Sequence, residues 1–226
     1  VCNSNIISLK LEGENPSGSI KDRLASHLIY TALRKGKLRP GQKIVEITTG
    51  NSGIAFSRIA SELGYQAEMI VPDTINQEII ERIRYYGGNA IIVPLAQGIE
   101  SFFELAEKKT KQGYFWSNQY GNKEAVSAYY ALGQELLRDV PVLDYLVVGI
   151  GTGGTIMGTG SELRRNNSLT KIIGVESFGK EHIDGIRNTS LIHRGDKDLY
   201  QKTFPDTTIR VSLAQASEAE ILLKKE

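Results

Sequence analysis

The feature that most constrains the fold is the alternation of short apolar runs with longer stretches of helical periodicity. Ile20, Leu24 and Leu28 recur every four residues, for example, which predicts a helix over 20–35. Strands are expected over 6–11, 43–47, 67–72, 89–95, 114–118, 144–150, 171–177 and 208–212, and helices over 20–35, 51–63, 76–86, 99–111, 123–138, 155–165 and 218–226. The polar stretch 178–206 is expected to be a long loop with short helices. Strands that alternate with helices form βαβ units, so we predict an α/β fold whose parallel sheets are covered on both faces.

Charge and composition narrow the classes of partner. The 226 residues include 27 Lys and Arg against 26 Asp and Glu, which gives no reason to expect nucleic acid or a membrane surface as partner. No apolar run is long enough to span a bilayer, and no signal peptide is recognised. The single cysteine, Cys2, excludes a disulfide within these residues and indicates a reducing compartment, so we expect a cytoplasmic protein. The histidines lack metal-ligand spacing, and no metal site is expected.

Lys21 occupies an unusual place, the first turn of the helix expected over 20–35. It lies in the segment NPSGSIKDR, where Ser19 is suited to cap the helix and Asp22 takes the capping-box position. The helix dipole disfavours a cation there by about 0.3–1 kcal/mol, which favours the neutral amine that Schiff-base chemistry requires. The small residues before Lys21 would admit a flat ligand. Taken alone, the segment fits a solvated surface lysine better than a catalytic one.

A polar loop, TTGNSG, joins the strand expected over 43–47 to the next helix. It places hydroxyl groups, an amide and backbone N–H groups together at a helix start: Thr48, Thr49, Gly50, Asn51 and Ser52. Such a helix start is an anion site, although each of these residue types is also a common helix cap. Because five of them exceed what one cap requires, we predict an anion-binding loop.

The loop GIGTGGT follows the strand expected over 144–150 and opens another helix. Gly149, Gly151 and Gly154 match the G-x-G-x-x-G pattern of dinucleotide-binding proteins, and Glu176 ends the next strand. An NAD-dependent oxidoreductase is therefore one hypothesis. Several βα units come before this loop, however, whereas the dinucleotide pattern usually opens its domain. Threonines beside the glycines also suit a compact phosphate monoester.

Taken together, the segments KLEGENPSGSIKDR, TTGNSGIA, NQY at 118–120 and GIGTGGTIMG resemble the cysteine synthase family. These are fold-type II enzymes that use pyridoxal 5'-phosphate (PLP). The resemblance implies two doubly wound, three-layer αβα domains of the tryptophan synthase β-subunit-like fold. Residues 1–24 and 123–226 would form the larger, phosphate-binding domain, and 25–122 the smaller domain with the substrate loop. It also implies a homodimer.

The resemblance implies a role for each matching residue. Lys21 matches the lysine that binds PLP covalently, and Asn51 matches the asparagine that contacts the 3'-oxygen of its ring. Residues that match the substrate-carboxylate site are Thr48, Thr49, Gly50, Ser52 and Gln119. Residues that match the cup around the PLP phosphate are Gly151, Thr152, Gly153, Gly154 and Thr155.

The implied reaction is a β-replacement on an O-activated serine by a transferase or lyase of amino-acid biosynthesis. Lysine removes the Cα proton, the β-substituent leaves, and a small nucleophile adds, which is sulfide in the cysteine synthases. After NQ this chain has YGNKEAVSAYYALG where the family has Asn-Pro repeats near the substrate mouth. Cystathionine β-synthase-type and diaminopropionate-forming activities therefore stay open, as does a non-catalytic paralogue. The family continues past the counterpart of residue 226, so the sequence is either part of a longer protein, which we expect, or a trimmed paralogue.

Overall fold

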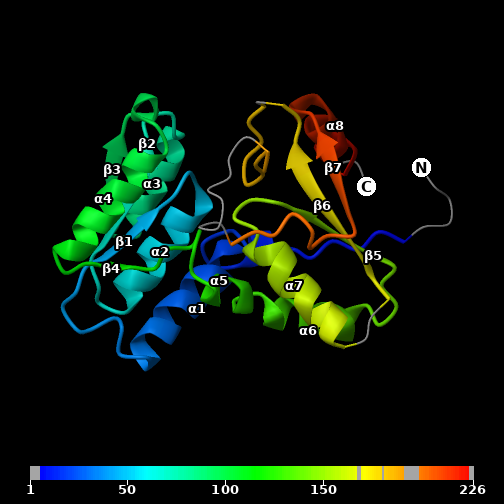
Figure 1. Ribbon diagram of the computed structural model, residues 1–226, viewed down its shortest axis with the longest axis horizontal. Coiled ribbons are helices and arrows are strands. Elements are labelled where there is room, and N and C mark those ends of the chain that lie inside the picture. Colours follow the sequence, from blue (N-terminus) through cyan, green and yellow to red (C-terminus); the bar gives the residue numbers. More distant parts are fainter. Residues whose placement is uncertain (1–5, 167–168, 180, 191–198, 224–226) are drawn as a thin grey trace.

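The computed structural model describes residues 6–166, 169–179, 181–190 and 199–223. Figure 1 shows two separate sheets with helices packed between and around them. Cys2, the end of the helix expected over 218–226 and parts of the loop expected over 178–206 lie outside the described residues.

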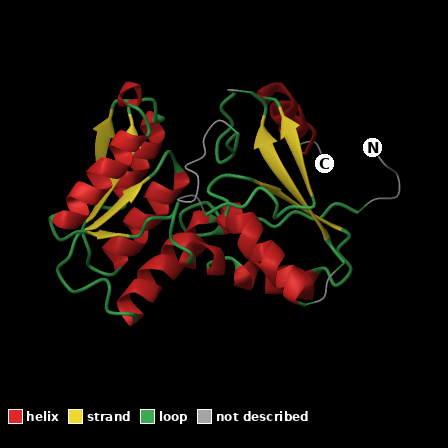
Figure 2. Ribbon diagram, viewed as in Figure 1, coloured by secondary structure: helices red, strands yellow, loops and turns green. Residues whose placement is uncertain are grey.

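The first sheet has four parallel strands in the order β3-β2-β1-β4 (Figure 2). Its strands are β1 (Ile44–Ile47), β2 (Ala67–Pro72), β3 (Asn89–Val93) and β4 (Phe115–Trp116), and its helices are α2 (Asn51–Glu62), α3 (Gln77–Tyr85) and α4 (Glu100–Lys111). Successive strand residues face opposite sides, so Ile44 and Met69 pack in the cluster of α2 whereas Val45 and Ile70 pack in the cluster of α4. Helices therefore cover both faces, as predicted for a parallel sheet.

The second sheet has three parallel strands in the order β5-β6-β7. The remaining helices are α1 (Lys21–Arg34), α5 (Glu124–Ser127), α6 (Tyr130–Asp139), α7 (Gly154–Arg165) and α8 (Leu213–Leu223), with short 3-10 helices at Glu12–Glu14 and Leu95–Gln97. The strands of this sheet are β5 (Tyr145–Gly149), β6 (Lys171–Ser177) and β7 (Thr207–Val211). Ile156 and Met157 of α7 pack against Ile172 of β6 on one face of the sheet. The predicted α/β fold with parallel sheets is confirmed. The division into two domains stays a prediction, and its first boundary, between residues 24 and 25, falls inside α1.

Three expected elements are wrong. Residues 6–11 form no strand, because no described strand pairs with them and Ile6 and Leu11 are exposed. The described residues of 178–206 contain turns and one isolated bridge rather than short helices. The helix expected over 123–138 is split into α5 and α6. The backbone of α7 lies so close to the split that a Cβ on Gly158 would be 2.1 Å from the Val126 carbonyl oxygen.

This close approach makes Gly158→Ala a test of the packing of α7. We expect the added methyl group to lower the free energy of unfolding by roughly 2–3 kcal/mol, even though alanine is intrinsically the better helix former. Gly13→Ala is the matched control, because nothing lies within 4 Å of a Cβ there. Chemical denaturation of the two variants measures the difference. Equal stability of the two would contradict the packing described.

Candidate active site

Lys21 is the first residue of α1, and its side chain is half-buried. Its backbone N–H donates to Ser19 Oγ at 3.2 Å, so Ser19 satisfies one of the free donors at the helix start, as expected. Asp22 does not complete a capping box with Ser19. Its Oδ2 instead accepts from the backbone N–H of Ser17 at 2.8 Å and from the Ser17 hydroxyl at 2.5 Å. Within the described part of the chain, Lys21 Nζ has no hydrogen bond or ion pair.

The turn before Lys21 is fixed to two helices of the first sheet. Asp22 is only 5% exposed, and its Oδ1 accepts from Arg58 Nη2 at 2.8 Å and Arg58 Nε at 3.1 Å. Arg58 belongs to α2. Arg82 of α3 donates from Nη2 to the Ser17 carbonyl oxygen at 2.8 Å. The backbone that carries Lys21 is therefore tied to the helix that follows the TTGNSG loop.

The hydroxyl group of Thr48 holds the backbone of the TTGNSG loop in place. Thr48 Oγ1 accepts from the N–H groups of Gly50 and Gly53, each at 3.1 Å, and Thr48 is buried. The side chains of Thr49 and Asn51, by contrast, are exposed at the start of α2. Thr48 thus shapes the loop, whereas the polar groups of Thr49 and Asn51 are accessible at the helix start.

Two further predicted site residues meet beneath this loop. Ser52 Oγ donates to Gln119 Oε1 at 2.9 Å, and Gln119 Nε2 donates to the Ile47 carbonyl oxygen at 2.7 Å. Both Ser52 and Gln119 are buried. Residues 67 positions apart are thereby brought into one polar site at the end of β1.

A carboxyl group that the sequence analysis missed lies directly behind these residues. Glu46 of β1 is fully buried, and its carboxylate accepts hydrogen bonds from Ile47 N, Trp116 Nε1, Ser117 Oγ and Gln119 N. Burial raises the pKa of the Glu46 carboxyl to about 7, although these hydrogen bonds oppose the rise. The only signal in the sequence is a charged residue inside the apolar run KIVEI.

The raised pKa predicts a pH-dependent stability. Between the ordinary value of 4.5 and about 7, folded Glu46 retains a proton that the unfolded chain has lost. The contribution of Glu46 to the free energy of unfolding therefore falls as pH rises through this window, by roughly 3 kcal/mol in all. We expect Glu46→Gln to lack this fall, so that its stability relative to the unsubstituted protein improves between pH 4.5 and 7. Denaturation at a series of pH values measures it, and identical pH slopes for both proteins would contradict the account.

The glycine-rich loop before α7 is tightly enclosed. Gly153 has φ of +90°, in the left-handed region, and a Cβ there would lie 2.5 Å from Cβ of the buried Tyr200. A Cβ on Gly151 would lie 2.7 Å from the Gly185 carbonyl oxygen. Gly154 opens α7, and the neighbouring hydroxyl groups of Thr152 and Thr155 are half-buried. The loop is thus a glycine-lined cradle at a helix start, a geometry suited to phosphate.

The segment that contains Leu199 and Tyr200 contacts both the stretch after Gln119 and the glycine-rich loop before α7. Leu199 donates its backbone N–H to the Tyr120 carbonyl oxygen at 2.9 Å, and Tyr120 follows Gln119 in the chain. The next residue, Tyr200, packs on Gly153. In the view of Figure 1, the start of α1 and the loop before α7 both reach the middle of the molecule, between the two sheets.

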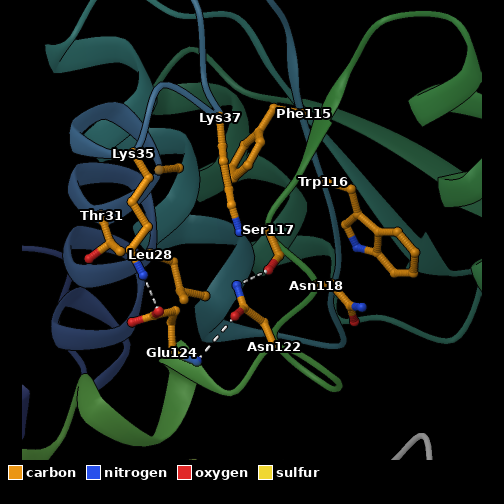
Figure 3. Close-up of a pocket in the computed structure, with 11 residues that line it drawn as sticks. Leu28, Thr31, Lys35, Lys37, Phe115, Trp116, Ser117, Asn118, Asn122 and Glu124 are labelled. Carbon is orange, nitrogen blue, oxygen red and sulfur yellow. Dashed lines mark hydrogen bonds and ion pairs between the residues drawn. The ribbon is translucent and has the colours of Figure 1, made fainter.

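A separate cavity of about 270 Å³ lies beside the 117–122 segment (Figure 3). Lys37, Trp116 and Asn118 line it, and an ion pair joins Lys35 to Glu124 at its edge. None of the site residues predicted from the sequence lines this cavity. It is therefore distinct from the candidate active site.

Comparison with known proteins settles the family. The model of the family described as "Pyridoxal-phosphate dependent enzyme" matches residues 2–222. The chain belongs to this family. It is 31% identical to a cysteine synthase of Staphylococcus aureus over 97% of this chain and 76% of that protein, and 36% identical to cysteine synthase B of Salmonella typhimurium over 82% and 62%. These relatives confirm the resemblance to cysteine synthases and the predicted PLP cofactor.

Solved structures agree with this assignment. An O-ureido-L-serine synthase superimposes with a TM-score of 0.88 at 30% identity, covering 96% of this chain and 72% of that one. A hydrogen sulfide-producing enzyme of Fusobacterium nucleatum gives a TM-score of 0.86 at 29% identity, covering 96% and 75%. No helix in the described ranges is both long and apolar enough to cross a membrane.

The dinucleotide-binding hypothesis receives no support from Glu176. This carboxylate is 2% exposed and accepts from the backbone N–H of Thr189 at 2.9 Å, its hydroxyl at 2.7 Å and Arg210 Nε at 2.9 Å. Burial alone would raise the pKa of Glu176, but the bonds from Thr189 and Arg210 outweigh it and lower the pKa. Glu176 thus holds its own loop instead of presenting a carboxylate to a ribose. The G-x-G-x-x-G spacing of Gly149, Gly151 and Gly154 therefore occurs here in a member of the pyridoxal-phosphate dependent family.

Proposed function

We propose that this enzyme catalyses a PLP-dependent β-replacement on an O-activated serine. The first candidate reaction is cysteine synthesis from O-acetylserine or O-phosphoserine and sulfide. Its support comes from the cysteine synthase relatives and the O-ureido-L-serine synthase neighbour. The observation that carries it is the half-buried Lys21, whose amine has no described partner. It lies on a turn tied through Asp22 and Arg58 to α2, the helix that follows the polar loop.

The described residues suit PLP. The glycine-lined loop packs so closely on Tyr200 and Gly185 that it admits no Cβ, and the start of α7 offers N–H groups to a phosphate. We assign the phosphate to Gly151, Thr152, Gly153, Gly154 and Thr155. Lys21 would bind the cofactor covalently, and Asn51, exposed at the start of α2, would contact its ring oxygen. When bound, PLP withdraws electrons from the Cα of an amino-acid substrate.

The substrate carboxylate would bind at the start of α2. Thr49 and the helix N–H groups supply donors, while Thr48 and Gly50 hold the loop in shape. Ser52 and Gln119 fix one another, so the substrate meets donors that are already oriented. The Lys21 amine then takes the Cα proton and the β-substituent leaves with its bonding electrons. The nucleophile forms a new bond to the β-carbon, and Lys21 returns the proton to Cα.

A substrate panel tests this proposal. O-acetylserine, O-phosphoserine and serine are each incubated with the PLP-loaded protein and with sulfide, homocysteine or ammonia, and the amino-acid products are identified by mass. We expect cysteine from O-acetylserine or O-phosphoserine and sulfide. A preference for homocysteine would favour the cystathionine-forming alternative. One structural neighbour of this chain is an O-acetylserine dependent cystathionine β-synthase of Helicobacter pylori. Preference for ammonia would favour diaminopropionate formation. If PLP binds and no combination gives a product, the protein is a non-catalytic paralogue.

A further inference from the structure

We propose that Glu46 is a positioning residue for substrate binding, because its buried carboxylate holds Gln119 in place at the carboxylate site. This inference rests on the proposed function, in which Gln119 binds the substrate carboxylate. Glu46 itself touches neither substrate nor cofactor in this account.

The four donors divide between the two oxygens of the carboxylate. Oε1 accepts from Ile47 N at 2.8 Å and from Trp116 Nε1 at 3.3 Å. Oε2 accepts from the Ser117 hydroxyl and from Gln119 N at 3.2 Å. The carboxylate thus joins β1 to Trp116, Ser117 and Gln119.

The position of Glu46 explains why this segment needs a side chain to hold it. Strand β4 is short, and its pairing with β1 ends where Val45 meets Trp116. Beyond that point the strand pairing is not continued, and the Glu46 carboxylate accepts from the Ser117 hydroxyl and the Gln119 N–H. Ser117 and Gln119 are each 1% exposed, so the hydrogen bonds are shielded from water. Figure 3 shows Ser117 held from its other side by Asn122, whose amide donates to the Ser117 carbonyl oxygen at 2.9 Å.

Two further hydrogen bonds, made by the side chain of Gln119, orient its amide group. Its Nε2 donates one hydrogen to Ile47 and its Oε1 accepts from Ser52. An amide nitrogen carries two hydrogens, so one remains for a substrate oxygen. The direction of this hydrogen also depends on the Gln119 backbone, which the bond to Glu46 ties to β1.

Glu46→Gln separates this role from simple burial. An amide nitrogen at the Oε1 position would face two fixed N–H donors, so it takes the Oε2 position. There the Ser117 hydroxyl can rotate and accept a hydrogen bond, whereas the Gln119 N–H cannot. The substitution therefore removes the bond to Gln119 selectively and preserves the side-chain volume.

The test uses the PLP-loaded protein at about pH 8, above the Glu46 pKa of about 7. For Glu46→Gln we expect the KM of the amino-acid substrate to rise about tenfold, with kcat and the KM of the nucleophile within about threefold. Amide hydrogen exchange of a peptide spanning residues 117–121 should become faster by a similar factor. The matched control is Glu68→Gln on β2, where the carboxylate binds Lys109 and the Tyr114 hydroxyl and lies away from the loop. We expect neither readout to change in the control.

The outcomes separate the inference from the proposed function. If Gln119→Ala raises the substrate KM but Glu46→Gln does not, the positioning role of Glu46 is wrong and the carboxylate site stands. If Gln119→Ala leaves KM unchanged, the assignment of Gln119 itself fails. A fall in kcat and rises in both KM values by similar factors in Glu46→Gln, together with faster exchange throughout the chain, would show a structural role only and overturn the inference.

Discussion

Replacing Lys21 by alanine is expected to lower kcat for β-replacement by roughly 10³- to 10⁴-fold. The substitution removes both the amine that binds the cofactor and the base that takes the Cα proton. It should leave the apoprotein as stable as before, because Lys21 Nζ has no hydrogen bond or ion pair among the described residues. Product formation and thermal unfolding of the apoprotein together measure this.

Lys37→Ala is the matched control. Lys37 is an exposed lysine that lines the separate cavity of Figure 3, away from the candidate active site. We expect this variant to retain the full rate. A rate for Lys21→Ala within about tenfold of the unsubstituted enzyme would contradict a role for Lys21 as the proton acceptor.

Gly153→Ala is expected to weaken PLP binding by roughly a hundredfold. Alanine is strained at a φ of +90°, and its Cβ would lie 2.5 Å from Cβ of Tyr200. Strain and overpacking each cost about 1–3 kcal/mol, and the loop must move out of its phosphate-binding shape to relieve them. Titration of the apoprotein with PLP measures the dissociation constant.

Gly13→Ala serves again as control, since a Cβ there meets nothing within 4 Å. Circular dichroism establishes that Gly153→Ala keeps its secondary structure. An unchanged PLP dissociation constant in a folded Gly153→Ala protein would place the phosphate elsewhere than in this loop.

Local patterns were enough to predict most of the helices and strands and the three polar segments of the site. The failures are places where a distant segment decides the outcome. Residues 6–11 have the apolar composition of a strand, yet a strand requires a hydrogen-bonded neighbour, and no described strand provides one. Asp22 has the spacing of a capping box with Ser19, but its oxygens accept hydrogen bonds from Ser17 and Arg58 instead.

Glu46 shows most clearly what one sequence cannot predict. A single carboxylate in an apolar strand is usually at the solvent-facing position of the pleat. Its burial depends on Trp116, Ser117 and Gln119, which approach from about 70 residues later in the chain. Arg82 likewise reaches the turn before Lys21 across 65 positions. The motifs predict which groups would contact the ligands, whereas the groups that hold those motifs in place are found only in the fold.

The most direct measurement of the central claim is to find which residue carries the cofactor. The purified protein is incubated with PLP, the bond between cofactor and lysine is reduced with borohydride, and the digested peptides are analysed by mass spectrometry. The account predicts a stable cofactor adduct on Lys21, in the segment NPSGSIKDR, and loss of that adduct in Lys21→Ala. An adduct on a different lysine, or none in a protein that has bound PLP, would contradict it.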